Sequence, residues 1–238
     1  MRALPRVTSA TLAPAPEAAE PTAPAWALAL AQPEFRRSAL WMCLLLGTLV
    51  GMVIPPFFAW MQQRPGTLLP DPLLALLPHH DVALAIFLLM YGAVGAGMGW
   101  LLRHPYLLLR GLWAYWLLLL LRVACIWLVP LLPPPGLVPM PDPFTTLVFH
   151  TAGSELITKD LFFSGHTATV ALLALAVRGR WWRRGLALVA VAVGLLVLVQ
   201  RVHYSYDVLA APFFAWLAYW GAGRLVLTAE EAAEAPAT

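Results

Sequence analysis

Six apolar runs follow one another along the chain, and each is close to the length that crosses a bilayer as a helix. About 20 residues of α-helix span the hydrocarbon core, where every backbone polar group must be paired within the segment. The chain is 61% hydrophobic and 11% charged, whereas soluble domains carry about 25% charged residues. We therefore predict an all-α polytopic membrane protein, a bundle of six transmembrane helices at residues 38–62, 82–102, 106–132, 161–178, 185–200 and 206–227.

The segments outside these runs are short, which predicts a single membrane domain over residues 38–227. Residues 1–37 are rich in Ala, Pro and Glu and are expected to form a disordered or interfacial tail, with a short helix at Trp26–Ala31. This start lacks the apolar core of a signal peptide, so the first run is expected to remain in the protein. The acidic residues 228–238 are expected to form a solvated tail.

The basic residues predict the orientation of the bundle. The chain has 15 Lys and Arg residues. With six spans, Arg64, Arg122, Lys159 and Arg201 lie on one side of the membrane, and all the others lie on the side of the two termini. The excess of positive charge marks the cytoplasmic side, so both termini are expected in the cytoplasm. The basic residues form no long run beyond Arg178–Arg184, so nucleic acid is not an expected partner. The Arg-, Ala- and Pro-rich composition favours a bacterial inner membrane.

Four polar residues stand at the edges of the last three runs, where burial near lipid is costly without a partner or a function. They are Ser164, His166, His203 and Asp207. If residues 203–207 open a helix, His203 and Asp207 share one face at i and i+4, and Asp207 can orient the imidazole. The connectivity brings both histidines to the outer face of the membrane. Two histidines and a carboxylate are typical of nucleophilic or acid–base catalysis.

Positive charge is expected beside these histidines. Arg122, Lys159 and Arg201 lie on the outer side near the same motifs. Ser164 and Gly165 stand where the fourth run begins, and a helix N-terminus binds anions through its free N–H groups. The set therefore predicts a pocket for a phosphate ester at the outer lipid interface.

The same side chains also have structural interpretations, which the sequence leaves open. His203 with Asp207 is also a common helix-end pair, and Arg122 could extend its charged group to the membrane interface. Tyr204 and Tyr206 suit interface anchoring. The adjacent His79, His80 and Asp81 fit a solvated loop better than a metal site, and Cys43 and Cys125 fit packing positions. We predict neither a metal nor a cofactor.

The motifs around the two histidines resemble those of a known family. Phe163-Ser-Gly-His-Thr167 with His203-Tyr-x-x-Asp207 resembles the type 2 phosphatidic acid phosphatase superfamily, and more closely its sphingomyelin-synthase-like branch. The resemblance covers roughly residues 68–225. Leu69-Pro-Asp71 is similar to the first motif of that branch, and Arg122 with Pro133-Pro-Pro-Gly136 is similar to its second.

Two departures distinguish the chain from either group. The phosphatases of the superfamily have an Arg six residues before the second histidine, where this chain has Val197 and places Arg201 closer. This difference favours the transferase-like branch. That branch in turn has Cys-Gly before the Asp of its third motif, where this chain has Thr158-Lys159.

The resemblance implies a lipid phosphoesterase or phosphotransferase that acts on a membrane phospholipid or lipid phosphate. His203 would attack phosphorus to form a phosphohistidine, Asp207 would orient His203, and His166 would protonate the leaving oxygen. Arg122, Lys159, Arg201, Ser164 and Gly165 would bind the phosphate. Water or a lipid hydroxyl would then accept the phosphoryl group. The alternatives are a lipid phosphate phosphatase that only hydrolyses, and a non-catalytic lipid transporter or scaffold.

Overall fold

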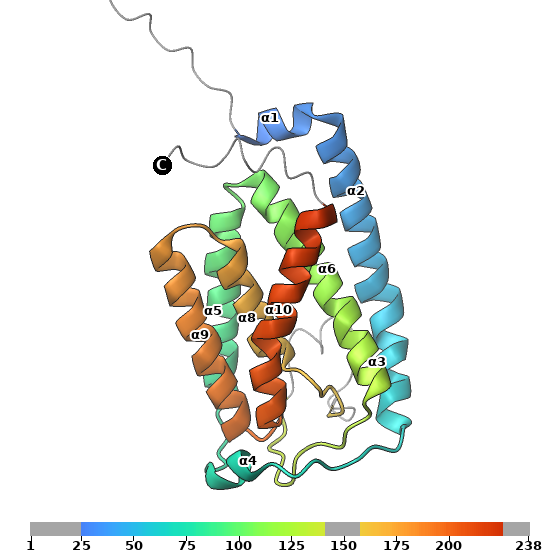
Figure 1. Ribbon diagram of the computed structural model, residues 1–238, viewed down its shortest axis with the longest axis vertical. Helices are drawn as coiled ribbons and strands as arrows, with labels where there is room; N and C mark the ends of the chain where they lie inside the picture. The colour runs from blue at the N-terminus through green and yellow to red at the C-terminus, as the bar shows by residue number, and fades with distance from the viewer. Residues whose placement is uncertain (1–24, 141–157, 226–238) are drawn as a thin grey trace, which may run out of the picture.

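The long helices lie side by side and are joined at one end by an extended layer of loops, as Figure 1 shows. This computed structural model describes residues 25–140 and 158–225. The described part of the chain is mostly helical and contains no strand, with one isolated bridge between Thr67 and Leu131, which confirms the all-α prediction for these residues. Residues 1–24 of the predicted N-terminal tail (1–37), the predicted tail at 228–238, and the middle of the long loop at 141–157 lie outside the described residues.

The first long helical element of the bundle consists of three consecutive segments, and a short helix precedes them in sequence. Helix α1 (Ala25–Ala31) forms the short helix expected there, and α2 (Pro33–Thr48) begins inside the segment assigned to the tail. A π-helical turn, η1 (Leu49–Val53), joins α2 to α3 (Ile54–Gln63). Pro55 and Pro56 occupy the first turn of α3. Proline lacks the N–H that bonds four residues back, so the wider π turn stands where regular α-helical pairing is interrupted.

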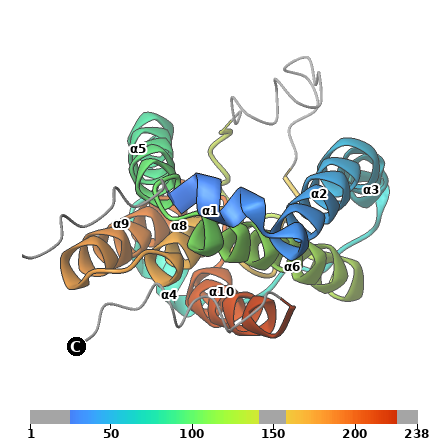
Figure 2. The ribbon, with the colours of Figure 1, turned by 90° about the horizontal axis from the view of Figure 1, so that it is seen from above.

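The remaining helices enclose α8 (Gly165–Ala176). In Figure 2 this short helix lies between its neighbours rather than at the rim. It packs against all four of them, and most of its residues are buried. These four are α5 (Ala83–Leu101), α6 (Pro105–Leu128), α9 (Arg180–Val199) and α10 (Ser205–Leu225).

A stripe of alanines brings α10 close to α6 and α8. Ala211, Ala215, Ala218 and Ala222 recur every three or four residues and are fully buried. They form one core cluster with buried residues of α6 and α8. Small side chains let helix backbones approach closely, which is how membrane helices associate without a hydrophobic driving force between them. This stripe fixes the position of the helix that follows His203.

Within residues 25–140 and 158–225, four helical segments are long and apolar enough to cross a membrane: Pro33–Gln63, Ala83–Leu101, Pro105–Leu128 and Arg180–Val199. The two helices that follow the predicted site motifs are not among them. Helix α8 is apolar but has only 12 residues, and α10 has 21 residues that include polar, aromatic and glycine positions. Four of the six predicted spans therefore correspond to candidate membrane-spanning helices, and the arrangement of six spans stays a prediction.

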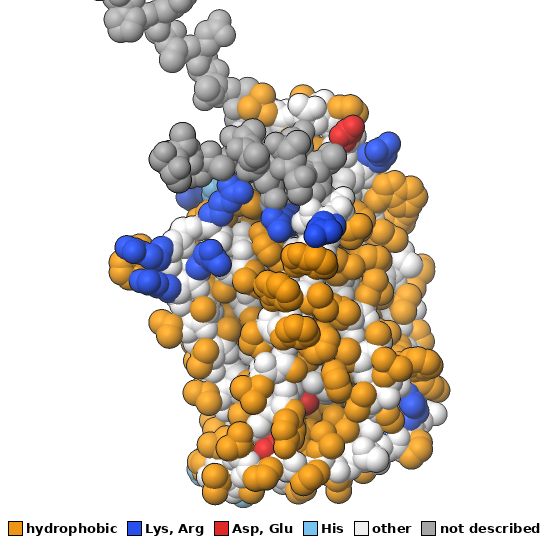
Figure 3. All heavy atoms as spheres, viewed as in Figure 1, with side chains coloured by type: hydrophobic (Ala, Val, Ile, Leu, Met, Phe, Trp, Pro, Cys, Tyr) orange, Lys and Arg blue, Asp and Glu red, His pale blue; other side chains and the backbone are white. Residues whose placement is uncertain are grey.

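The two ends of the bundle differ in charge. The described chain starts and ends at the same end, which carries α1 and the α8–α9 turn (Figure 1). Figure 3 shows Lys and Arg side chains gathered at that end, above a broad hydrophobic flank. The expected basic turn at Arg178–Arg184 includes the first residues of α9, where Trp181 is exposed. The opposite end holds α4 (Pro72–Leu76) and the loops that surround the predicted site.

Candidate active site

His203 and Asp207 form the buried pair that their spacing predicts. His203 Nδ1 lies 3.2 Å from Asp207 Oδ2, and the two side chains are 4% and 1% exposed. The expectation that residues 203–207 open a helix is wrong in detail, because α10 begins at Ser205. The pair still forms because the Asp207 carboxylate folds back over the helix start, where it also accepts from the Tyr204 N–H at 3.2 Å. With Nδ1 donating to Asp207, the second ring nitrogen of His203 keeps its lone pair.

His166 lies beside this pair although it is distant in sequence. It is the second residue of α8, and its ring centroid is 6.3 Å from that of His203, with the planes at 67°. The main chain ties the two motifs together, because the Ser164 N–H donates to the Asp207 carbonyl at 3.1 Å. The Ser164 hydroxyl caps α8 by accepting from the Thr167 N–H at 3.3 Å. The first turn of α8 is therefore held against the start of α10.

Arg122 reaches this first turn from α6. Its guanidinium donates to the Phe163 carbonyl at 3.1 Å and forms an ion pair with Asp160. A Cβ at Gly165 would collide with the Arg122 guanidinium, so glycine is required for this approach. Arg122 is only 9% exposed, and guanidinium has five N–H donors, more than these two partners use. The positive charge of Arg122 and the N-terminus of α8 together make a site suited to an anion.

Lys159 and Arg201, the other predicted phosphate ligands, bind main-chain carbonyls in the structure. Lys159 Nζ donates to the carbonyls of Gln62 and Arg64 at 2.7 and 2.6 Å, at the end of α3. Arg201 donates to the Leu77 carbonyl at 2.9 Å, directly after α4. Carbonyls at helix C-termini carry partial negative charge and attract cations. The structure thus brings Arg122, Ser164 and Gly165 to the histidines, whereas Lys159 and Arg201 anchor neighbouring loops.

Two backbone positions near the site are strained. Phe162 has φ of 97° and Arg201 has φ of 59°, in a region that costs roughly 1–2 kcal/mol for residues with a side chain. Arg201 closes α9 in a Schellman motif, in which the Val202 N–H bonds to the Val197 carbonyl at 3.2 Å. Phe162 precedes Phe163, whose ring stacks on Phe214 at 4.5 Å. Packing and hydrogen bonds on both sides hold these positions.

Three further residues, Gln200, Tyr204 and Asp71, join the loops of this end, a role that was not predicted for them. Gln200 is fully buried, accepts from the Val82 N–H at 2.6 Å, and donates to Asp81 at 3.2 Å. Tyr204 was expected at the membrane interface, but it is fully buried and donates to the Leu132 carbonyl at 2.9 Å. Asp71 accepts from the N–H groups of Leu74 and Ser205. A polar residue directly after an apolar run was the available signal for Gln200.

The described residues include no group of three His, Cys, Asp or Glu side chains that could hold a metal ion. His79 and His80 are exposed. Asp81 accepts from the Ala83 N–H at 3.1 Å and so caps α5. Cys43 and Cys125 are both free thiols.

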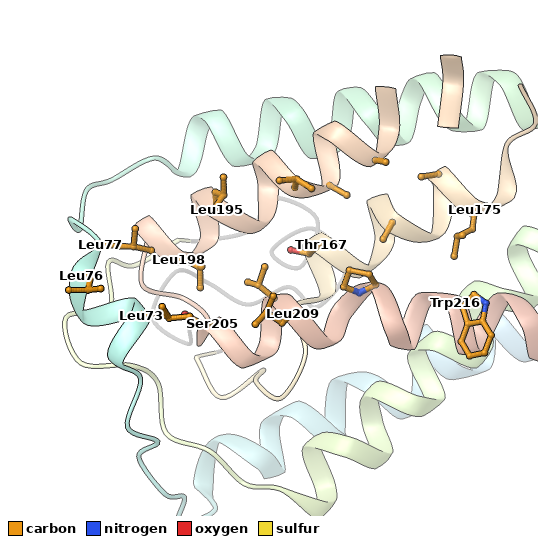
Figure 4. Close-up of a pocket in the computed structure, with 17 residues that line it drawn as sticks. Leu73, Leu76, Leu77, Thr167, Leu175, Leu195, Leu198, Ser205, Leu209 and Trp216 are labelled. Carbon is orange, nitrogen blue, oxygen red and sulfur yellow. The ribbon is translucent and has the colours of Figure 1, made fainter. Parts of the chain in front are cut away.

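An apolar cavity close to the site does not contain the histidines. It is an apolar groove of about 740 Å³ between α9 and α10, with α8 as its floor and α4 at one end, as Figure 4 shows. Thr167, Ser205 and Val208 line it, but His166, His203 and Asp207 do not. Successive residues of a helix point about 100° apart, so His166 and Asp207 point in other directions than their neighbours Thr167 and Val208, and His203 lies before α10 begins.

The segment that carries the two histidines is similar to a known protein family. Residues 159–222 match the family model of the PAP2 superfamily, C-terminal part. The PAP2 match covers about a quarter of the chain and contains His166, His203 and Asp207 as well as helices α8 and α9. No curated protein matches the chain. The PAP2 match supports the wider superfamily resemblance, and it does not single out the sphingomyelin-synthase-like branch.

Proposed function

We propose that this protein is an integral-membrane lipid phosphoesterase that works through a phosphohistidine on His203. The observation that carries the proposal is the meeting of His203, oriented by Asp207, with His166 at a ring distance of 6.3 Å. The PAP2 match over the same segment supports phosphatase-type chemistry on a lipid phosphate. The four membrane-length helices support a substrate that reaches the site from the bilayer.

The first half-reaction transfers the phosphoryl group to the protein. The free ring nitrogen of His203 attacks phosphorus, a P–N bond forms, and the bond to the leaving lipid oxygen breaks. His166, protonated at the start, donates its proton to that oxygen. Asp207 stabilises the positive charge that develops on the His203 ring. Positioned proton transfer of this kind contributes roughly 10²–10⁴-fold in rate.

The second half-reaction restores the protein. His166, now neutral, takes a proton from an acceptor hydroxyl, whose oxygen attacks phosphorus as the P–N bond breaks. Arg122 and the N–H groups at the start of α8 stabilise charge on the non-bridging oxygens throughout. Lys159 and Arg201 support the site through the loops that they hold. Water as acceptor gives hydrolysis, whereas a lipid hydroxyl gives the transfer that the sphingomyelin-synthase-like motifs favour.

The proposed topology has six spans with both termini in the cytoplasm and the site at the outer face of a bacterial inner membrane. The gathering of basic side chains at the end opposite the histidines supports this orientation.

The test uses the purified protein in liposomes with head-group-labelled phosphatidate, phosphatidylcholine or phosphatidylethanolamine, each with and without diacylglycerol or ceramide. We expect phosphate release from phosphatidate and an acid-labile phospho-enzyme, both absent in His203→Ala. Tyr206→Phe, at a half-exposed side chain in the same turn, serves as the matched control and should keep activity. A new head-group lipid that depends on the acceptor would favour transfer. Normal activity in His203→Ala, or no turnover with any of these lipids, would contradict the proposal.

A further inference from the structure

We propose that Asp71 is a positioning residue that holds the start of α10 and thereby keeps Asp207 on His203. The inference rests on the function proposed above and adds a residue that its mechanism does not use. Asp71 Oδ1 accepts from the Leu74 N–H at 2.9 Å, and Oδ2 accepts from the Ser205 N–H at 2.6 Å. One carboxylate in the loop after α3 therefore caps both α4 and α10.

Helix α10 needs an acceptor from outside because its own cap is incomplete. The residue before the helix is Tyr204, whose side chain carries no acceptor that can reach back to the first turn. Asp207 instead bonds to the Tyr204 N–H, as the third helical residue does in a capping box. The Ser205 N–H has no carbonyl partner within the helix. Ser205 is only 4% exposed, so water cannot serve as the acceptor for its N–H. Asp71 provides that acceptor.

The link to the chemistry is the double role of Asp207. The same Oδ2 atom faces the Tyr204 N–H and His203 Nδ1, each at 3.2 Å. Without Asp71, the Ser205 N–H competes with His203 for the carboxylate of Asp207, which lies in the same helical turn. Loss of Asp71 would then displace Asp207 from the imidazole and leave the orientation of the His203 ring unfixed.

The loop that carries Asp71 is itself fixed. The Leu69 N–H donates to the Tyr204 hydroxyl at 3.3 Å, and that hydroxyl donates to the Leu132 carbonyl at 2.9 Å. Burial acts to raise the pKa of Asp71, but hydrogen bonds from Leu74 and Ser205 outweigh it and keep this pKa below its ordinary value. An ionised carboxylate at the N-terminus of α10 is also favoured by the helix dipole.

The test is a double-mutant cycle of Asp71→Asn and Ser205→Pro, measured as phosphate release from phosphatidate. Proline removes the Ser205 N–H and is well tolerated at the first position of a helix. We expect Asp71→Asn to lower kcat roughly 10- to 100-fold with KM unchanged, because a misplaced reacting group loses rate rather than binding. In the Ser205→Pro background the same change should cost less than twofold. Asp81→Asn, at the aspartate that caps α5, is the matched control and should keep kcat.

Hydrogen exchange on the same proteins tests whether Asp71 caps α10, and this test does not depend on enzymatic turnover. Asp71→Asn should speed exchange in the first turn of α10, and Asp81→Asn should not. An unchanged kcat, or equal losses of kcat in both backgrounds, would overturn the positioning role even when wild type is active. A wild type without turnover would overturn the proposed function, and unchanged exchange at α10 would then overturn the capping role separately.

Discussion

The two ends of the bundle are held by different kinds of contact. At the end with the histidines, buried or partly buried polar side chains bond to main chain far away in sequence, as Gln200 does to Val82 and Asp71 to Ser205. At the basic end, several contacts join near neighbours, such as Arg224 over Trp220 and Trp100 stacked on His104. A site for chemistry needs loops fixed from several sides, whereas an end that meets lipid head groups needs mainly exposed charge.

The largest difference between the two ends is expected from the same substitution made at one glycine of each end. Gly165→Ala at the site would place a Cβ against the Arg122 guanidinium, whereas Gly185→Ala in α9 meets nothing within 4 Å. Alanine favours a helix over glycine by about 1 kcal/mol, so Gly185→Ala should be neutral or stabilising. We expect Gly165→Ala to lower kcat/KM about 100-fold, because displacement of Arg122 misplaces the phosphate site. Kinetics and thermal melting of both variants check this, and equal behaviour of the two would contradict the close approach of Arg122.

A smaller effect, on stability alone, should distinguish the ends again. Gln200→Ala leaves the partly buried Val82 N–H without its acceptor, which costs about 1–3 kcal/mol. Arg183→Ala, at an exposed residue of the basic end, should change stability by less than about 0.5 kcal/mol. Denaturant unfolding in detergent measures both. A Gln200 variant as stable as wild type would show that the loop end does not depend on this side chain.

The smallest expected effect is a pH dependence confined to the loop end. The pKa of Asp71 is lowered in the folded protein: burial acts to raise it, but hydrogen bonds from Leu74, Ser205 and Leu73 outweigh burial. Its contribution to stability is therefore present above the pKa of an unfolded Asp, about 3.9, and is lost as pH falls through the lower folded value. Unfolding midpoints between pH 6 and 3 should fall more steeply for wild type than for Asp71→Asn. Parallel profiles would exclude this contribution.

Part of the site could be predicted because an unpaired polar or charged side chain near lipid costs free energy, so such residues indicate a partner or a function. His166, His203 and Asp207 stand at the edges of apolar runs, where polar groups need partners, and the alternation of the runs brings both histidines to one end. The partners of Lys159 and Arg201 could not be predicted, because main-chain carbonyls leave no mark in a sequence. The same holds for Tyr204, whose aromatic ring with a hydroxyl suits a membrane interface as well as a buried junction of three loops.

The helical membrane class, the basic end and the pairing of His203 with Asp207 could be predicted from the amino-acid sequence alone. This is because hydropathy, charge and short spacing act locally or through composition. Only the tertiary structure decided which cation reaches the histidines, that Gly165 must lack a side chain, and that Asp71 caps a helix 134 residues away. These features depend on how separate helices and loops meet, and such meetings are set by packing and by the pairing of buried polar groups across the whole chain.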